Sequence, residues 1–164
     1  MKLFENKHVF GHTWDKVTAA HWVKYPSDLT SHVVAVDYLS RHVDSNNHLV
    51  TERLLTCKQH VPKFVLSLFG EQAYSYVYER STVDPVGKQF ESVSVNLTYS
   101  NVITVEERCR FTARSDETVF SQRVAIDCDS GVSFLKSQIE AMGMHRFQSN
   151  AINGRNALEN TLKA

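Results

Sequence analysis

The chain has 164 residues, of which 42% are hydrophobic and 22% are charged, so it is long enough to bury the core of one domain spanning residues 1–164. Eighteen basic residues balance eighteen acidic ones, which excludes a global electrostatic attraction to nucleic acid but not a local cationic pocket. No apolar run approaches the ~20 residues that a membrane-spanning helix needs.

The first half of the chain predicts a strand, a helix and a hairpin. Thr13 suits the N-cap of the helix, and Pro26 ends it because the residue before a proline disfavours helical backbone. The Asp44-Ser45-Asn46-Asn47 turn joins the two strands of the hairpin. The predicted elements are, in order, a strand over residues 2–10, a helix over 14–24, and strands over 32–43 and 48–58.

The strand over residues 48–58 places a cation on an apolar side. Successive side chains of a strand point to opposite faces, so Arg53 shares one face with Leu55 and Cys57. If that face is the inner one, an arginine points into the protein and needs a counter-ion. Glu52 and Glu79 are candidate partners in a salt bridge, and a bound anion is the alternative.

The second half predicts a short apolar segment, four more strands and one long helix. Consecutive strands with short turns are antiparallel neighbours, and a twisted sheet of seven strands curls. We therefore expect an α+β fold: a curved seven-stranded antiparallel sheet with a long C-terminal helix across its concave face, enclosing a cavity. The predicted elements are the apolar segment over residues 62–69, strands over 73–83, 90–99, 103–111 and 118–127, and a helix over 132–162.

One stripe of the last helix changes from apolar to polar along its length. Its members, at helical spacing, are Val132, Leu135, Ile139, Met142, Arg146, Asn150, Asn153 and Ala157. Either the helix emerges into water after Met144, or the polar half faces a bound anion inside the protein. With Lys24, His32 and Arg53 as further donors, a cavity with apolar walls and a cationic end would suit an amphiphile with a negative head. Each of these residues could instead be an ordinary surface charge or part of a salt bridge.

The apolar segment over residues 61–70 has two interpretations. It is too short to span a bilayer, and as a helix it would be apolar nearly all round apart from Lys63 and Ser67. It is either a small helix buried against the sheet or a lid that covers the cavity and touches a membrane surface.

The sequence carries no recognisable catalytic, cofactor or metal motif. No nucleophile elbow or glycine-rich phosphate loop occurs, and Glu106 and Glu107 are neighbours on a strand and therefore point to opposite faces. The eight histidines are scattered, and the three cysteines have no zinc or disulfide spacing. The N-terminal stretch has neither the apolar core of a signal peptide nor an Arg-rich presequence. We expect no enzyme activity, no metal and no cofactor.

Several segments together resemble the PRELI-domain family, and within it the yeast Ups and animal slowmo-like branch. They follow in family order and cover almost the whole chain: MKLFENKHVFGHTWDKVTAAHWVKYP, SHVVAVDYLSRHV, LVTERLL, VPKFVLSLFG, ERSTVDPVGKQF, VNLTYSNVITVEE and RFQSNAINGRNALE. The resemblance implies a phospholipid transfer protein of the mitochondrial intermembrane space that works as a heterodimer with a small helical protein bearing paired cysteine motifs. The branch is associated with phosphatidylserine and a sister branch with phosphatidic acid. The alternative is a lipid-independent binding module for that partner.

The resemblance also implies a set of site residues. The expected lid and membrane contacts are Pro62, Phe64, Val65, Leu68 and Phe69. The expected head-group contacts are Lys24, His32, Arg53, Lys58, Arg146, Asn150 and Asn153. The chain departs from the family at two places, because Cys57 or His60 stands at a basic position beside Lys58, and Ile152-Asn153 replaces a common lysine pair. Fewer positive charges favour a serine head group over bare phosphatidic acid.

Overall fold

Seven strands form one antiparallel sheet in the computed structural model, which describes residues 1–58, 74–128 and 136–163. Their order across the sheet is β1-β7-β6-β5-β4-β3-β2, so the first two strands lie at opposite edges. This arrangement confirms the predicted fold class. The strands are β1 (Lys2–Phe10), β2 (Val33–Val43), β3 (Leu49–Lys58), β4 (Tyr74–Asp84), β5 (Gln89–Asn96), β6 (Ile103–Arg114) and β7 (Glu117–Cys128).

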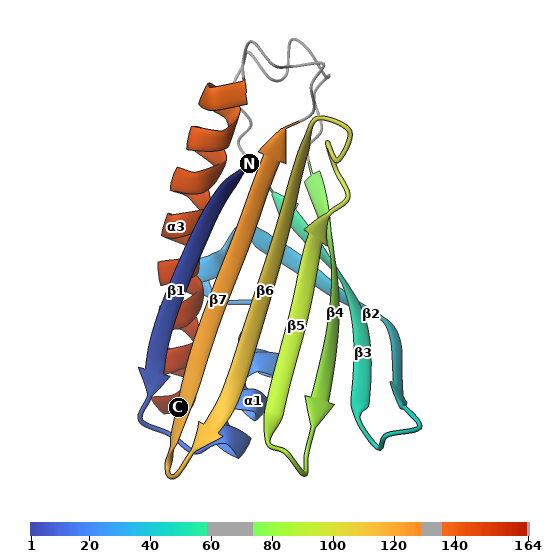
Figure 1. Ribbon diagram of the computed structural model, residues 1–164, viewed down its shortest axis with the longest axis vertical. Helices are drawn as coiled ribbons and strands as arrows, with labels where there is room; N and C mark the ends of the chain where they lie inside the picture. The colour runs from blue at the N-terminus through green and yellow to red at the C-terminus, as the bar shows by residue number, and fades with distance from the viewer. Residues whose placement is uncertain (59–73, 129–135, 164) are drawn as a thin grey trace.

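The helices lie on one side of this sheet (Figure 1). Helix α1 (Trp14–Val23) and the 3₁₀ turn η1 (Asp28–Thr30) carry the chain from β1 to β2, that is, from one edge of the sheet to the other. The long helix α3 (Lys136–Lys163) runs along β1 and β7 and also contacts α1 and η1. None of the described helices is long and apolar enough to cross a membrane.

The predicted elements match the observed ones within a few residues at most boundaries. The second strand begins at Val33 rather than His32, the first helix ends at Val23 rather than Lys24, and the turn η1 was not predicted. The predicted apolar segment over 62–69 and the first turn of the predicted last helix lie outside the described residues.

Aspartates organise two of the hairpin turns. Between β2 and β3, the Asp44 carboxylate accepts hydrogen bonds from the backbone N–H groups of Asn46 and His48, at 2.8 and 2.9 Å. Between β4 and β5, Asp84 accepts from Val86 and Gly87 in the same manner, at 3.0 and 2.9 Å. A Cβ atom at Gly87 would lie 2.4 Å from Asp84 Oδ2, so a side chain there would displace the carboxylate that organises the turn.

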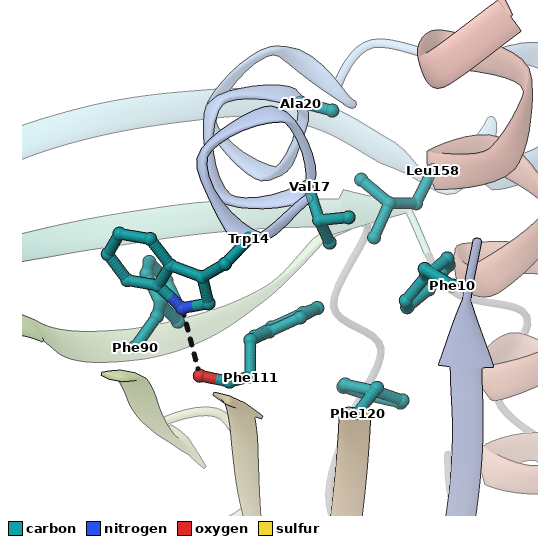
Figure 2. Packing of buried hydrophobic residues seen from close by; sticks show 8 residues of the cluster. All are labelled: Phe10, Trp14, Val17, Ala20, Phe90, Phe111, Phe120 and Leu158. Atoms are coloured by element: carbon teal, nitrogen blue, oxygen red, sulfur yellow. Dashed lines mark hydrogen bonds between the residues drawn. The ribbon is translucent and has the colours of Figure 1, made fainter. Parts of the chain in front are cut away.

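A cluster of buried apolar side chains closes the α1 end of the space between the sheet and the helices (Figure 2). Trp14 packs into it, and its indole N–H donates to the backbone carbonyl of Phe111 at 3.1 Å. Leu158 reaches the same cluster from α3, which fixes the C-terminal half of that helix against α1 and the strands. The cluster consists of Phe10, Trp14, Val17, Ala20, Phe90, Phe111, Phe120 and Leu158.

The inner face of β3 carries the arginine that the alternation predicted. Thr51, Arg53, Leu55 and Cys57 are buried, whereas the residues between them are half-buried. Arg53 is only 1% exposed, so a cation does point into the protein. The register of the sheet places it directly opposite Glu79 on β4.

Candidate ligand-binding cavity

A cavity of about 260 Å³ lies between the concave side of the sheet and the helices. Every strand contributes at least one side chain to its wall, and α3 contributes residues from Phe147 to Leu158. Apolar side chains make up much of the surface, notably Leu55, Val77, Val105, Phe111, Phe147 and Leu158. Such a largely apolar hollow with a few polar groups is typical of a small-molecule site.

Lys24 supplies a cation to the cavity. It follows α1 directly, is half-buried, and holds its ammonium 4.9 Å from the centroid of the Tyr25 ring. Burial acts to lower the pKa of Lys24, but the acidic groups around it, including Tyr25, Glu79 and Glu107, outweigh burial and raise that pKa. Lys24 is therefore charged at neutral pH and faces the interior of the cavity.

Arg53 lies behind the cavity wall, where other side chains of the protein accept the hydrogen bonds of its guanidinium. Its Nε and Nη2 donate to Oε1 of Glu79 at 2.9 and 2.5 Å, and its Nη2 lies 3.2 Å from Nε2 of His21. The guanidinium also stacks against Trp22, 5.0 Å from the ring centroid. Glu79 was one of the two salt-bridge partners expected from the sequence, so the inward cation has a counter-ion within the protein.

Glu107 brings a carboxylate into the same cavity from β6. Gln122 on β7 donates to its Oε1 at 2.5 Å, and the thiol of Cys109 donates to the same oxygen at 3.3 Å. Its neighbour Glu106 instead pairs with Arg108. The prediction that these two glutamates point to opposite faces is thus confirmed, and the inner one lines the cavity.

Two buried polar atoms at the cavity have no hydrogen-bond partner among the described residues. They are Nδ1 of His21 and Oε1 of Gln122, on side chains that are 2% and 7% exposed. Burial, followed by the charges of Lys24 and Arg53, holds the pKa of His21 well below its usual value. His21 is therefore neutral, and because its Nε2 faces a donor of Arg53, its proton lies on Nδ1.

The two cysteines of the cavity are poor nucleophiles. Burial raises the pKa of Cys57 to about 11, and burial together with Glu107 raises the pKa of Cys109. Both thiols are protonated at neutral pH, which removes the reactive thiolate. Among the residues that the structure describes, no group of three or more His, Cys, Asp and Glu side chains is placed to hold a metal ion.

The expected head-group residues fall into two groups in the structure. Lys24, His32 and Asn150 line the cavity, and burial lowers the pKa of His32. Arg53, Lys58, Arg146 and Asn153 are not among the lining residues. Lys58 is exposed at the end of β3, while Arg146 and Asn153 are half-buried on α3. The expected lid residues Pro62, Phe64, Val65, Leu68 and Phe69 lie outside the described part of the chain.

Several polar residues of the wall were not predicted as site residues from the sequence, among them Arg155, Glu107, His21 and Gln122. Arg155 lies two residues from the nearest members of the polar stripe that was followed, at the edge of the helix face that runs from Phe147 to Leu158. Side chains alternate between the two faces of β6, so Glu107 shares a face with Val105 and Cys109, and this spacing would have predicted that it points to the inner side of the sheet. For His21 and Gln122, the sequence indicates only that they belong to a helix and a strand with regularly spaced apolar residues, and nothing in it points to a role at a site.

The sequence is similar to one protein family and to several known proteins. The model of the PRELI-like family matches residues 15–164. Protein UPS2, mitochondrial, from Saccharomyces cerevisiae is 38% identical over 99% of this chain and 73% of its own length. UPS-like protein C36.10 from Schizosaccharomyces pombe is 35% identical over 99% and 90%. PRELI domain-containing protein 1, mitochondrial, from Bos taurus is 31% identical over 92% and 70%.

Solved structures share the fold at low sequence identity. A protein from Thermus thermophilus superimposes with a TM-score of 0.66 at 10% identity, covering 98% of this chain and 97% of that one. A START superfamily protein from Mycobacterium smegmatis gives a TM-score of 0.57 at 11% identity, with 96% and 97% covered. The curved sheet closed by a long C-terminal helix is therefore a START-like architecture. The sequence matches, and not the shared fold, show that the chain belongs to the PRELI-like family.

Proposed function

We propose that this protein transfers an acidic glycerophospholipid between the outer and inner mitochondrial membranes through the intermembrane space, with phosphatidylserine favoured over phosphatidic acid. The observation that carries the proposal is the largely apolar hollow beneath α3 with the Lys24 ammonium in its wall. Membership of the PRELI-like family and the mitochondrial names of two relatives support the compartment.

Binding in this proposal is non-covalent. The Lys24 ammonium neutralises the phosphate, Arg155 and the amide of Asn150 provide further donors from α3, and the acyl chains contact the apolar wall. Arg53 contributes indirectly, because its guanidinium positions His21 and is neutralised by Glu79. The cavity is small for two acyl chains, so uptake of a whole phospholipid widens the space between α3 and the sheet. No bond is made or broken, and the protein is not an enzyme.

Three further parts of the proposal rest on the sequence and its family resemblance. Pro62, Phe64, Val65, Leu68 and Phe69 form a gate that contacts the membrane transiently during uptake and release. The protein works as a heterodimer with a small helical protein bearing paired cysteine motifs in the intermembrane space. Lys58, Arg146 and Asn153 remain predicted head-group contacts. Arg53 was expected to contact the head group as well, but in the structure it donates to Glu79, and the proposal therefore gives it an indirect role.

A glycine in the wall gives a direct test of the cavity. Gly154 on α3 lines the cavity, and a Cβ atom built there meets no atom within 4 Å, so Gly154→Leu adds bulk to the hollow. Glycine is disfavoured inside helices by about 1 kcal/mol, so the substitution should not destabilise α3. The matched control is Gly143→Ala on the same helix, where the added methyl only makes ordinary contacts with Ile103 and Ile126.

The assay measures transfer of fluorescent phosphatidylserine from donor to acceptor vesicles. We expect transfer by the wild type and by Gly143→Ala, and loss of transfer by Gly154→Leu with an unchanged circular dichroism spectrum. Equal transfer by both variants would refute the cavity as the carrier. A wild type that binds the helical partner yet moves no lipid would instead support a lipid-independent binding module.

A further inference from the structure

The cavity contains an acceptor-rich wall whose charge is opposite to that of Lys24. Glu107 on β6 and Gln122 on β7 form this wall, joined by the hydrogen bond from Gln122 Nε2 to Glu107 Oε1. Cys109, which pairs with Gln122 across the two strands, donates to the same Glu107 oxygen. The three side chains hold one another in a fixed arrangement on the inner face of the sheet.

Glu79 and Glu107, the carboxylates that the described residues bring to the cavity, differ in their counter-ions. Glu79 binds the buried guanidinium of Arg53 directly. Glu107, in contrast, forms no ion pair within 4 Å with any described residue, and the side chains that donate to it, Gln122 and Cys109, are neutral. The Lys24 ammonium, whose pKa Glu107 helps to raise, acts on this carboxylate from a distance and forms no ion pair with it. A half-buried carboxylate whose direct hydrogen-bond donors are all neutral is a favourable position for a cation from the ligand.

The amide of Gln122 adds an acceptor beside this carboxylate. Because its Nε2 donates to Glu107, its other end is the oxygen Oε1, which is buried and has no partner among the described residues. A buried acceptor without a donor costs free energy, and a ligand N–H would satisfy it. His21 Nδ1–H is the opposite case, a buried donor at the same cavity that lacks an acceptor among those residues.

We propose that Glu107 and Gln122 recognise an ammonium group in the head of the bound phospholipid, while Lys24 and His21 face its phosphate. The inference rests on the proposed function and narrows its ligand to phospholipids that carry a primary amine. A head of phosphate alone has no donor for Gln122 Oε1 and places negative charge in the same cavity as Glu107. The wall thus selects against phosphatidic acid as well as for an amine.

The test compares transfer of phosphatidylserine, phosphatidylethanolamine and phosphatidic acid with identical acyl chains, each as a trace in phosphatidylcholine vesicles. Glu107→Gln removes the charge and keeps the shape, and Gln122→Met removes the acceptor. The matched control is Glu106→Gln, one residue away and on the opposite face of β6. Circular dichroism and urea unfolding verify that each variant is folded.

We expect Glu107→Gln to lower the ratio of amine-lipid transfer to phosphatidic acid transfer by roughly tenfold, the typical effect of losing a charged hydrogen bond. Gln122→Met lowers the same ratio, and Glu106→Gln leaves it unchanged. If the wild type moves lipid but folded Glu107→Gln keeps the ratio, the inference fails and the transfer function stands. If the wild type moves none of the three lipids, both fail.

Discussion

The buried ion pair between Arg53 and Glu79 allows a quantitative test of the fold. The pair joins β3 to β4 through two hydrogen bonds to one carboxylate oxygen, and the side chains are only 1% and 8% exposed. The substitution Glu79→Gln leaves the guanidinium without its counter-ion in a site closed by Trp22 and His21. Removing one partner of a buried pair costs about 3–5 kcal/mol, and the remaining amide oxygen places the expected loss at about 3 kcal/mol.

Urea unfolding followed by circular dichroism measures this loss, which should also lower Tm by roughly 6–12 °C for a chain of this size. Glu91→Gln is the control, because Glu91 pairs with Arg110 on the surface and its loss should change stability by less than about 1 kcal/mol. The double variant Arg53→Met with Glu79→Leu should recover most of the stability, since it removes both charges together. If Glu79→Gln unfolds at the same urea concentration as the wild type, Glu79 is not the counter-ion of the Arg53 guanidinium, and the result contradicts the structure.

Three further predictions concern single residues. His21 stays neutral in the folded state, whereas in the unfolded chain it is protonated near its usual pKa of 6.5. The free energy of unfolding should therefore fall as the pH drops below about 6.5, by up to ~1.4 kcal/mol per pH unit. Urea titrations at several pH values measure this dependence, and the variant His21→Gln should lack the contribution of His21. Gly143→Ala should raise the free energy of unfolding by about 0.5–1 kcal/mol, because α3 gains helix propensity without a clash; a loss would show that the helix packs more tightly there. Gly87→Ala should cost about 1–2 kcal/mol and lower Tm, because the added Cβ displaces the Asp84 carboxylate from the turn; an unchanged Tm would contradict that turn geometry.

The fold could be predicted from the sequence because the patterns that define its strands and helices each lie within a short stretch of the chain. Alternation, turn residues and one long helical stretch define the strands and the helix, and short connections make neighbouring strands antiparallel. The turn η1 escaped prediction because three residues carry no periodicity. No motif in the chain indicates the pairing of β1 with β7, which are far apart in the sequence.

The site was only partly predictable, because the charge of a buried side chain can be neutralised either by another residue of the protein or by a bound ligand. The alternation correctly placed Arg53 inside, but register alone decides that Glu79, on the next strand of the sheet, lies opposite it. For that reason Arg53→Glu, which seems from the sequence a clean test of head-group binding, would bury two carboxylates together and unfold the protein. On α3, most of the residues that line the cavity lie one position along the helix from the predicted stripe, and Arg155 lies two positions from its nearest members.

Solvent extraction and mass spectrometry of the purified protein test the central claim most directly. We expect the wild type to carry one intact phospholipid with an amine in its head, and Gly154→Leu, folded and purified in the same way, to carry none. Recovery of no lipid from the wild type, or of equal lipid from both proteins, would contradict the claim that the hollow beneath α3 is the binding site.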